Sequence, residues 1–318
     1  MFEEIKKLIE SHDTIVLHRH ANPDGDAIGS QVGLATLIED NYPDKRVYVV
    51  GDPTTRYDFV DGYRLDEVAD EVYPTALAIV LDSATAELVS DKRFASSHAT
   101  ARIDHHIFCE HFCQEEVVDT SYESCAGMIA AFALEAGWNV SLKAASAVYT
   151  GIVTDSGRFR YDSTSPRTLR LAAAMLEKGV DTNELYRNLY AQDLDGLRRK
   201  AYFSRKITTY EDSPVAYIYT TADELDELGI TDVFSISRGM VGVMSDLKGV
   251  DIWVNFTENR AEGKVWVELR SSRYNINPIA VKYGGGGHQK ASGADVADFQ
   301  EAMAMLADLK RLTENQHD

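Results

Sequence analysis

Near its N-terminus the chain gathers residue types that could bind a metal ion, in the stretch HRHANPDGDAIGS at residues 18–30. His20, Asp24 and Asp26 lie within seven residues there, around a proline and a glycine that constrain the backbone. An imidazole among carboxylates suits Mn²⁺ or Mg²⁺ better than a metal that prefers thiolates. The alternative is that Asp24 and Asp26 only form turns and cap the next helix.

Further Asp and His residues follow places where strands or helices are expected to end, namely Asp82, Asp104, His105, His106 and Asp155. Asp82 comes directly after residues 76–81, a continuous apolar run that is typical of a strand covered on both faces. Open α/β sheets bind ligands at the carboxyl ends of their strands, so these residues could share one site. Taken alone, Asp82 could equally be a turn residue, and residues 104–106 could form a solvated loop.

A structural zinc site is a competing interpretation of the histidines and cysteines at residues 105–113. Its donors would be His105, His106, Cys109, His111 and Cys113. These residues lack the paired spacing that is typical of structural zinc, so we expect the cysteines to be small packing residues.

The elements that must position these residues alternate between strand and helix up to about residue 180, as in α/β folds. Strands are predicted at residues 14–17, 47–50, 76–81 and 101–103, and helices at 3–10, 31–39, 142–154 and from Ser121 or Ser124 to Ala136. This alternation predicts a mainly parallel sheet flanked by helices.

From residue 183 to about 206 the chain reads as charged helical segments, and we place the domain boundary there. The predicted domains are residues 1–185, a helical linker at 186–210 and a smaller α/β domain at 211–318. Within the last, we predict a strand at 215–220, a hairpin formed by 251–256 and 264–270, and a closing helix at 298–313. Trp253 and Trp266 are expected to be packing residues, with base stacking as the alternative.

With 318 residues, 26% charged and 44% hydrophobic, the chain is expected to be a soluble globular protein of two domains. Its net charge of −19 argues against general adhesion to nucleic acid or anionic membranes, although a bound metal pair could still attract a phosphate. The acidic N-terminus does not resemble a signal peptide, and no apolar run is long enough to span a membrane. Three cysteines are consistent with a reducing, cytoplasmic location.

Five motifs in order resemble the DHH phosphoesterase family and its attached DHHA1 domain: HANPDGD at 20–26, the Asp82 strand end, DHH at 104–106, TDSGRFRY at 154–161 and YGGGGHQKASG at 283–293. Within the family the chain is similar to bacterial nanoRNases, which implies hydrolysis of short RNA to mononucleotides and of 3′-phosphoadenosine 5′-phosphate (pAp) to AMP. Cyclic or linear dinucleotides such as c-di-AMP and pApA are alternative substrates. A pyrophosphatase or exopolyphosphatase agrees less well with the second domain. A non-catalytic nucleotide sensor would need a missing ligand, and no ligand of the motifs is missing.

The resemblance implies two divalent ions, usually Mn²⁺, with Mg²⁺ or Co²⁺ as alternatives. It assigns His20 and Asp24 to one ion, Asp26, His105 and Asp155 to the other, and Asp82 to both. Asp82 would thereby be catalytic, as would His106, which would face the substrate phosphate as a proton donor or hydrogen-bond partner. Asp104 would support the histidines and fix the orientation of their rings.

For substrate binding, the resemblance points to Arg160, Arg270, Gly285, Gly286, Gly287 and His288. Consecutive glycines leave backbone N–H groups accessible to a phosphate or ribose, and Arg can hold a phosphate through two hydrogen bonds. The alternatives are a flexible turn for the glycines and a surface ion pair for Arg160. The expected partners are short single-stranded RNA or small nucleotides. Binding to a membrane or to a long nucleic-acid duplex is not expected, and the chain could form a homodimer.

Overall fold

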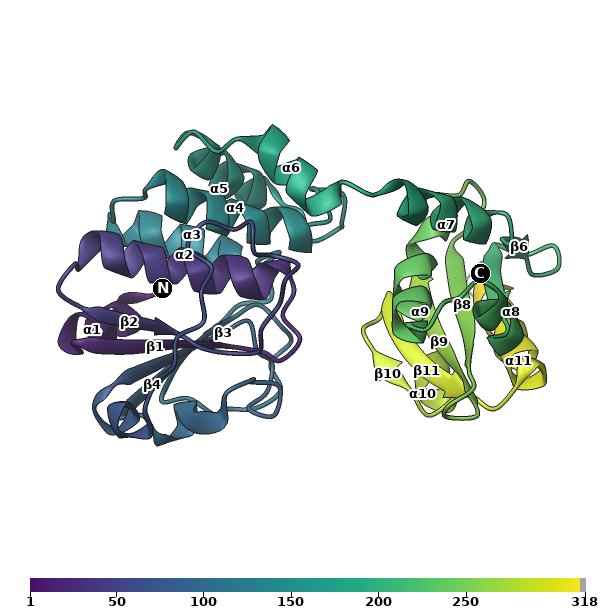
Figure 1. Cartoon of the computed structure of the whole chain (residues 1–318), viewed down its shortest axis with the longest axis horizontal. Coiled ribbons are helices and arrows are strands. Elements are labelled where there is room, and N and C mark those ends of the chain that lie inside the picture. Colours follow the sequence, from purple (N-terminus) through teal and green to yellow (C-terminus); the bar gives the residue numbers. More distant parts are fainter. Residues whose placement is uncertain (315–318) are drawn as a thin grey trace. The chain divides into compact units, whose positions relative to one another are not determined.

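The computed structural model describes residues 1–314, and the chain divides into two compact units. The first is Met1–Ala191 and the second begins at Gln192, and each combines a sheet with helices (Figure 1). The predicted α/β class is therefore confirmed for both halves of the chain. Within the described residues, no helix has the length and apolar character needed to cross a bilayer.

The first unit contains a five-stranded sheet in the order β2-β1-β3-β4-β5, and every neighbouring pair is parallel. Its strands are β1 (Thr14–Arg19), β2 (Arg46–Val49), β3 (Leu77–Leu81), β4 (Ala99–Asp104) and β5 (Glu115–Val118). The first four match the predicted strands, whereas β5 was not predicted because its sequence, EEVV, is half charged and lies at the sheet edge. Since all five strands run in one direction, their carboxyl ends lie along the same edge of the sheet.

Helices cover one face of this sheet (Figure 1). They are α1 (Glu3–Ser11), α2 (Gly25–Asn41), α3 (Cys125–Ala136), α4 (Leu142–Asp155), α5 (Pro166–Leu176) and α6 (Thr182–Tyr190). Helices α2 and α4 approach closely, because a Cβ at Gly29 would lie 2.6 Å from the backbone nitrogen of Gly151. The opposite face is covered by loops and two short 3₁₀ segments, η1 (Asp70–Thr75) and η2 (Lys92–Ser96).

The ends of two helices illustrate what local sequence could predict. Helix α3 begins after the Ser124 cap and ends at Gly137 in the left-handed conformation, as predicted. Helix α2 begins at Gly25 instead of Gln31, because Asp24 caps it by accepting hydrogen bonds from the N–H groups of Asp26 and Ala27. Asp24 thus caps this helix, which does not prevent it from also binding a metal, and Asp26 lies in the first helical turn.

The second unit contains a six-stranded mixed sheet in the order β10-β11-β9-β8-β7-β6. Its strands are β6 (Thr208–Thr209), β7 (Val215–Thr220), β8 (Ile252–Asn259), β9 (Lys264–Ser271), β10 (Gly286–Gly287) and β11 (Ala291–Val296). The predicted hairpin is confirmed as the antiparallel pair β8 and β9. Its helices are α7 (Leu194–Ser204), α8 (Ala222–Glu227), α9 (Val233–Val241), α10 (Asn277–Lys282) and α11 (Phe299–Glu314), with a short 3₁₀ segment η3 (Gly242–Met244).

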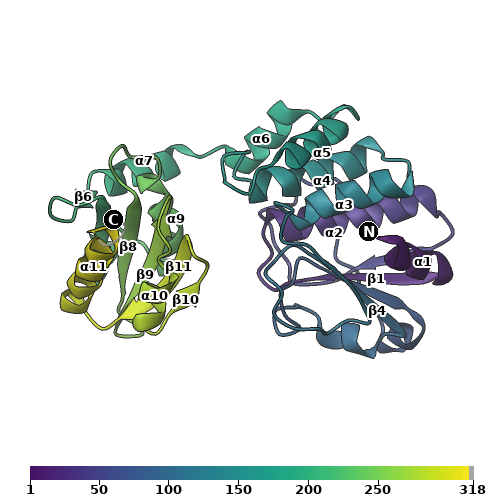
Figure 2. The same ribbon diagram turned by 180° about the vertical axis from the view of Figure 1, so that it is seen from behind.

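This second sheet is packed between two apolar layers, one on each face. Residues of α10 and α11 pack against one face, and residues of α7, α8 and α9 pack against the other (Figure 2). Phe203 of α7 is fully buried in the second of these layers. The alternating residues of β9 therefore face two different environments.

Candidate metal centre

Carboxylates and imidazoles converge where the strands of the first sheet end. They form three overlapping groups in which the donor atoms lie within 4.8 Å of one another: His20, Asp24 and Asp82; Asp26, His105 and Asp155; and Asp82, His105 and His106. The structure therefore brings together all six residues that the sequence predicts as metal ligands. The first group contains His20, Asp24 and Asp82, as predicted for one ion. The second contains Asp26, His105 and Asp155 but not the Asp82 that was predicted to be shared, and Asp82 belongs to the first and third groups.

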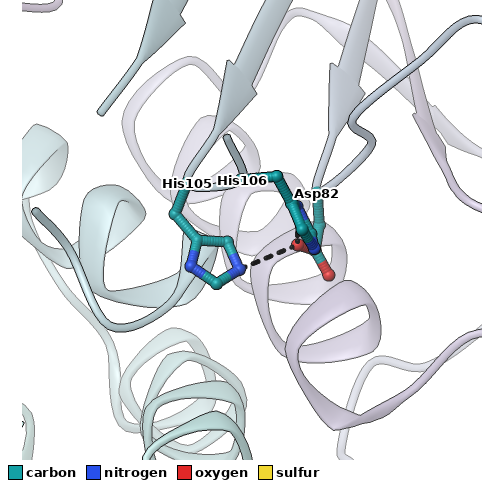
Figure 3. A group of neighbouring side chains, drawn as sticks. All are labelled: Asp82, His105 and His106. Carbon is teal, nitrogen blue, oxygen red and sulfur yellow. Dashed lines mark ion pairs between the residues drawn. The ribbon is translucent and has the colours of Figure 1, made fainter. Parts of the chain in front are cut away.

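Asp82 lies at the centre of this arrangement, directly after β3 (Figure 3). Its side chain is 2% exposed, and its φ of 51° is unusual for a residue other than glycine. One carboxylate oxygen, Oδ2, lies 3.5 Å from His20 Nε2, and the other, Oδ1, lies 3.4 Å from His105 Nε2. Among the described residues, Oδ1 has no hydrogen-bond partner. A buried carboxylate oxygen without a partner is costly, and a bound cation would satisfy it.

Asp26 is held by the N-terminus of a helix that lies far away in the sequence. Its carboxylate accepts hydrogen bonds from the backbone N–H groups of Cys125, at 2.6 Å, and Ala126, at 2.8 Å, which begin α3. These bonds fix the carboxylate, whose Oδ2 lies 3.7 Å from His105 Nε2. Asp155, the last residue of α4, brings its Oδ2 to 3.6 Å from the same nitrogen.

The hydrogen bonds of two histidines define which ring nitrogen remains available. His20 Nδ1 lies 2.7 Å from the carbonyl oxygen of Ala21 and donates to it, so Nε2 faces the carboxylates. His106 Nδ1 lies 2.7 Å from Asp104 Oδ1, which leaves its Nε2 as the nitrogen that could meet a substrate. This contact is the orienting interaction that the sequence analysis expects of Asp104.

Arg102 is a residue that the sequence analysis did not single out. It is fully buried in β4 and donates to Asp104 Oδ2, at 2.5 Å, and to the carbonyl oxygens of Ala84 and Glu110, both at 3.1 Å. Its guanidinium also lies over the ring of Phe112, 4.7 Å from the centroid. Arg102 thereby connects the loops that follow β3 and β4. The signal that could have found it was an arginine between the apolar residues Ala101 and Ile103 of a predicted strand.

Electrostatics also favour a cation at this site. Burial and the charges of Asp82 and Asp24 raise the pKa of the Asp155 carboxyl to about 7, and burial also raises the pKa of Asp26. Burial would lower the pKa of His20, but the Asp82 carboxylate outweighs it and raises that pKa to about 9. The site therefore retains protons without a cation. Two divalent ions would balance the charge of its four carboxylates, so the residues fit the predicted metal pair.

The predicted substrate-binding residues lie in both units. Arg160 is an exposed residue that follows α4 in the first unit. Arg270 lies on β9 in the second unit, where its Nη2 is 3.0 Å from Glu268 Oε2 and its Nη1 donates to the carbonyl oxygens of Leu269 and Ser292. The ion pair with Glu268 was not predicted, although residues two apart on a strand share one face.

The glycine run is divided between a turn, which contains Gly284, and the sheet. Gly286 and Gly287 form β10, an edge strand that pairs antiparallel with β11. A Cβ at Gly285 would lie 2.0 Å from the carbonyl oxygen of Gly293, and Gly287 has a φ of 126°, so both positions require glycine. His288 follows as an exposed residue whose N–H donates to the carbonyl oxygen of Ala291.

The zinc interpretation is not supported by the geometry. In the part of the chain that the structure describes, no group of candidate metal donors includes Cys109, His111 or Cys113. His111 is instead hydrogen-bonded to Glu116, and all three cysteines of the chain have free thiols.

Comparison with known proteins adds independent evidence. A model described as the DHH family, N-terminal domain, matches residues 14–152, and a DHHA1 domain model matches residues 232–315. Over 315 residues the chain is 36% identical to the bifunctional oligoribonuclease and PAP phosphatase NrnA of Bacillus subtilis strain 168, which covers 98% of each protein. The chain belongs to the DHH family. The predicted family, DHHA1 domain and enzyme class, a hydrolase of phosphoester bonds, are thereby confirmed.

Other relatives extend this similarity to the whole chain. The bifunctional oligoribonuclease and PAP phosphatase NrnA of Mycoplasma pneumoniae is 32% identical over 316 residues, which cover 97% of this chain and 95% of that protein. The crystal structure of an exopolyphosphatase-related protein from Bacteroides fragilis is similar with a TM-score of 0.86 and 26% identity, and covers 96% of this chain and 94% of its own.

Proposed function

We propose that this DHH-family enzyme hydrolyses short single-stranded RNA to mononucleotides and pAp to AMP, with two divalent ions, preferably Mn²⁺, in the candidate metal centre. The observation that carries the proposal is the buried Asp82 carboxylate, whose Oδ2 faces His20 of one predicted ligand set and whose Oδ1 faces His105 of the other. Near full-length similarity to proteins named as oligoribonucleases and PAP phosphatases supports the substrate class. The free thiols of the three cysteines are consistent with a cytoplasmic location, which we also propose.

In this proposal, the side chains of the first unit perform the chemistry. Two bound divalent cations would supply an acidified water and stabilise charge on the phosphate oxygens. His20 and Asp24 would hold one cation and Asp26, His105 and Asp155 the other, with Asp82 shared by both. His106, whose Nδ1 is bonded to Asp104, would present Nε2 to the phosphate and donate a proton toward the leaving oxygen.

The second unit would bind parts of the substrate that are remote from the scissile bond. Arg270 offers a planar guanidinium that can bind a phosphate with two hydrogen bonds, and its partner Glu268 would be displaced or shared. The glycine strand, His288 and, in the first unit, Arg160 are the further contacts that we propose. Remote contacts of this kind orient a reacting phosphate and so increase the rate of the chemical step.

A substrate panel tests the proposal. We would measure turnover of pAp, pApA, c-di-AMP, a 3-mer and a 20-mer RNA, and pyrophosphate, after chelation and with Mn²⁺, Mg²⁺ or Co²⁺ added back. We expect pAp and the 3-mer to be hydrolysed fastest, with Mn²⁺, and the 20-mer and pyrophosphate to be poor substrates. A clear preference for c-di-AMP or pApA would replace this function with the dinucleotide alternative.

A further inference from the structure

A hollow of about 340 Å³ opens on the second sheet, on the face against which α9 packs. Its lining includes Phe234 and Arg238 from α9, Trp266 and Glu268 from β9, and the backbone of Gly284 and Gly285. The size lies at the lower end of the range for ligand pockets, which runs from about 300 to 1,000 Å³. None of these residues belongs to the candidate metal centre.

The hollow presents an aromatic surface to solvent. Phe234 is 56% exposed, and its ring packs edge-on against Trp266, with 6.5 Å between centroids and 86° between planes. The Trp266 indole is fixed because its Nε1 donates to Glu262 at 3.1 Å. Arg238 lies over the Phe234 ring, 5.2 Å from its centroid. Exposed aromatic rings beside Arg are the surfaces on which proteins stack the bases of single-stranded nucleic acids.

The other tryptophan of this sheet face serves as a contrast. Trp253 packs against the buried apolar layer under α8 and α9, as the sequence predicted. Trp266 instead borders the hollow beside an exposed phenylalanine. A packing role therefore accounts for Trp253, but it does not account for the exposed ring of Phe234 beside the half-buried Trp266.

The hollow is continuous with the proposed phosphate contact. Glu268 links the two regions, because its Oε1 lies 3.3 Å from Arg238 Nε and its Oε2 lies 3.0 Å from Arg270 Nη2. Asp295, the other carboxylate of the lining, is paired with Lys264 at 3.5 Å, so both carboxylates have cationic partners. An RNA strand whose phosphate is held by Arg270 would therefore meet a hollow in which both lining carboxylates, Glu268 and Asp295, are paired with cations.

The spacing along β9 indicates which base could reach the aromatic pair. Strands rise about 3.4 Å per residue, so Trp266 lies roughly 13 Å from Arg270 along the strand. At this separation, the base that lies against the aromatic pair need not belong to the nucleotide whose phosphate Arg270 holds. The aromatic pair is therefore positioned for the base of a further nucleotide in the strand.

We propose that this hollow is a nucleobase subsite, in which Phe234, Trp266 and Arg238 stack the base of a nucleotide beyond the one that Arg270 holds. The inference rests on the proposed function and deepens it, because it explains how an oligonucleotide would be bound more tightly than a mononucleotide. Gly284 and Gly285 contribute a floor without side chains, against which a planar base can lie. Stacking does not depend on base identity, so the subsite would serve any short RNA sequence.

The test compares two substrates on one enzyme preparation. pAp has a single base, whereas a trinucleotide RNA has bases that can reach the subsite. For Phe234→Ala we expect the ratio of kcat/KM for the trinucleotide to that for pAp to fall about 5- to 100-fold, the range typical of losing one stacked base. Phe234→Trp should restore the ratio, because it restores a stacking surface.

The matched control is Phe299→Ala at the start of α11. Phe299 is 51% exposed, like Phe234, but it packs edge-on against Tyr219 and does not line the hollow. We expect its substitution to leave the ratio unchanged. An unchanged ratio in Phe234→Ala, with both substrates hydrolysed, would overturn the subsite and leave the proposed function intact. A parent enzyme that hydrolyses neither substrate would instead overturn the proposed function, and the subsite with it.

Discussion

The two units differ in how they hold their candidate functional groups. In the first unit two of these groups, Asp82 and Asp26, are buried and fixed by the fold, Asp82 by a constrained backbone and Asp26 by two N–H groups of α3. In the second unit they lie on an edge strand and a half-exposed strand face, where the Arg270 side chain is 29% exposed. Charges in a dry, buried site interact far more strongly than charges near water. We infer that the candidate metal centre requires rigidly held side chains, whereas the proposed substrate-binding residues can adjust their positions to the substrate.

The largest effect should come from substitution of Asp82, which belongs to two of the three donor groups. Asp82→Asn should lower kcat for pAp by about 10³-fold or more, because losing a shared ligand removes several kcal/mol of charge stabilisation. Asp24→Asn should cost less, since Asp24 belongs to one group and its side chain is 59% exposed. Turnover and Mn²⁺ stoichiometry of both variants provide the measurement. Parental turnover in Asp82→Asn would remove the two-metal assignment.

The next prediction separates the adjacent histidines. His105→Ala should reduce Mn²⁺ content, because His105 Nε2 faces Asp26, Asp82 and Asp155. His106→Ala should retain the metal and lose turnover by about 10²- to 10⁴-fold, the range typical of a general acid. Metal analysis beside steady-state kinetics distinguishes the two. If His106→Ala loses the metal and His105→Ala keeps it, their assigned roles are reversed.

A smaller, substrate-dependent effect is expected in the second unit. Arg270→Ala should lower kcat/KM for pAp or a dinucleotide by about 10- to 100-fold, because hydrogen bonds to charged groups contribute about 1.5–3 kcal/mol. Bis-p-nitrophenyl phosphate, which needs little holding, should be hydrolysed nearly as before.

The matched control for Arg270 is Arg260→Ala, an exposed arginine of the same unit that pairs with Asp223 and Asp226. It should change neither substrate. Equal losses on both substrates in Arg270→Ala would show that Arg270 supports the fold, and its phosphate-binding role would be abandoned.

The last prediction concerns the stability of the protein without metal. Folding raises the pKa of Asp155 to about 7 and of His20 to about 9, so the metal-free folded state binds more protons than the unfolded chain. Its stability should therefore fall as the pH rises from about 6 to 9, by on the order of 2–4 kcal/mol. Mn²⁺ should abolish this decrease. Unfolding of chelated protein at both pH values, with and without Mn²⁺, tests it; a metal-free stability that rises with pH would contradict the site's electrostatics.

The order and type of most elements, and the residues that converge on the candidate metal centre, could be predicted from the sequence alone. The apolar run before Asp82 and the Ser124 and Gly137 signals around α3 are local, because strand burial and helix capping depend on neighbouring residues. The motif residues lie at the ends of these strands and helices, so the elements determine their positions. Parallel strands then bring their carboxyl ends to one edge, so the convergence of these residues could be expected without coordinates.

The hydrogen-bond and ion-pair partners of those residues depend on the tertiary structure and could not be predicted from the sequence. Asp26 is bound by N–H groups about 100 positions away, and Glu268 pairs with both Arg270 and Arg238, which lies on a different element. The same holds for Arg102, whose contacts join two loops, and for the hollow between α9 and β9. Such contacts depend on how helices and sheets pack, and neither residue spacing nor local propensity carries that information.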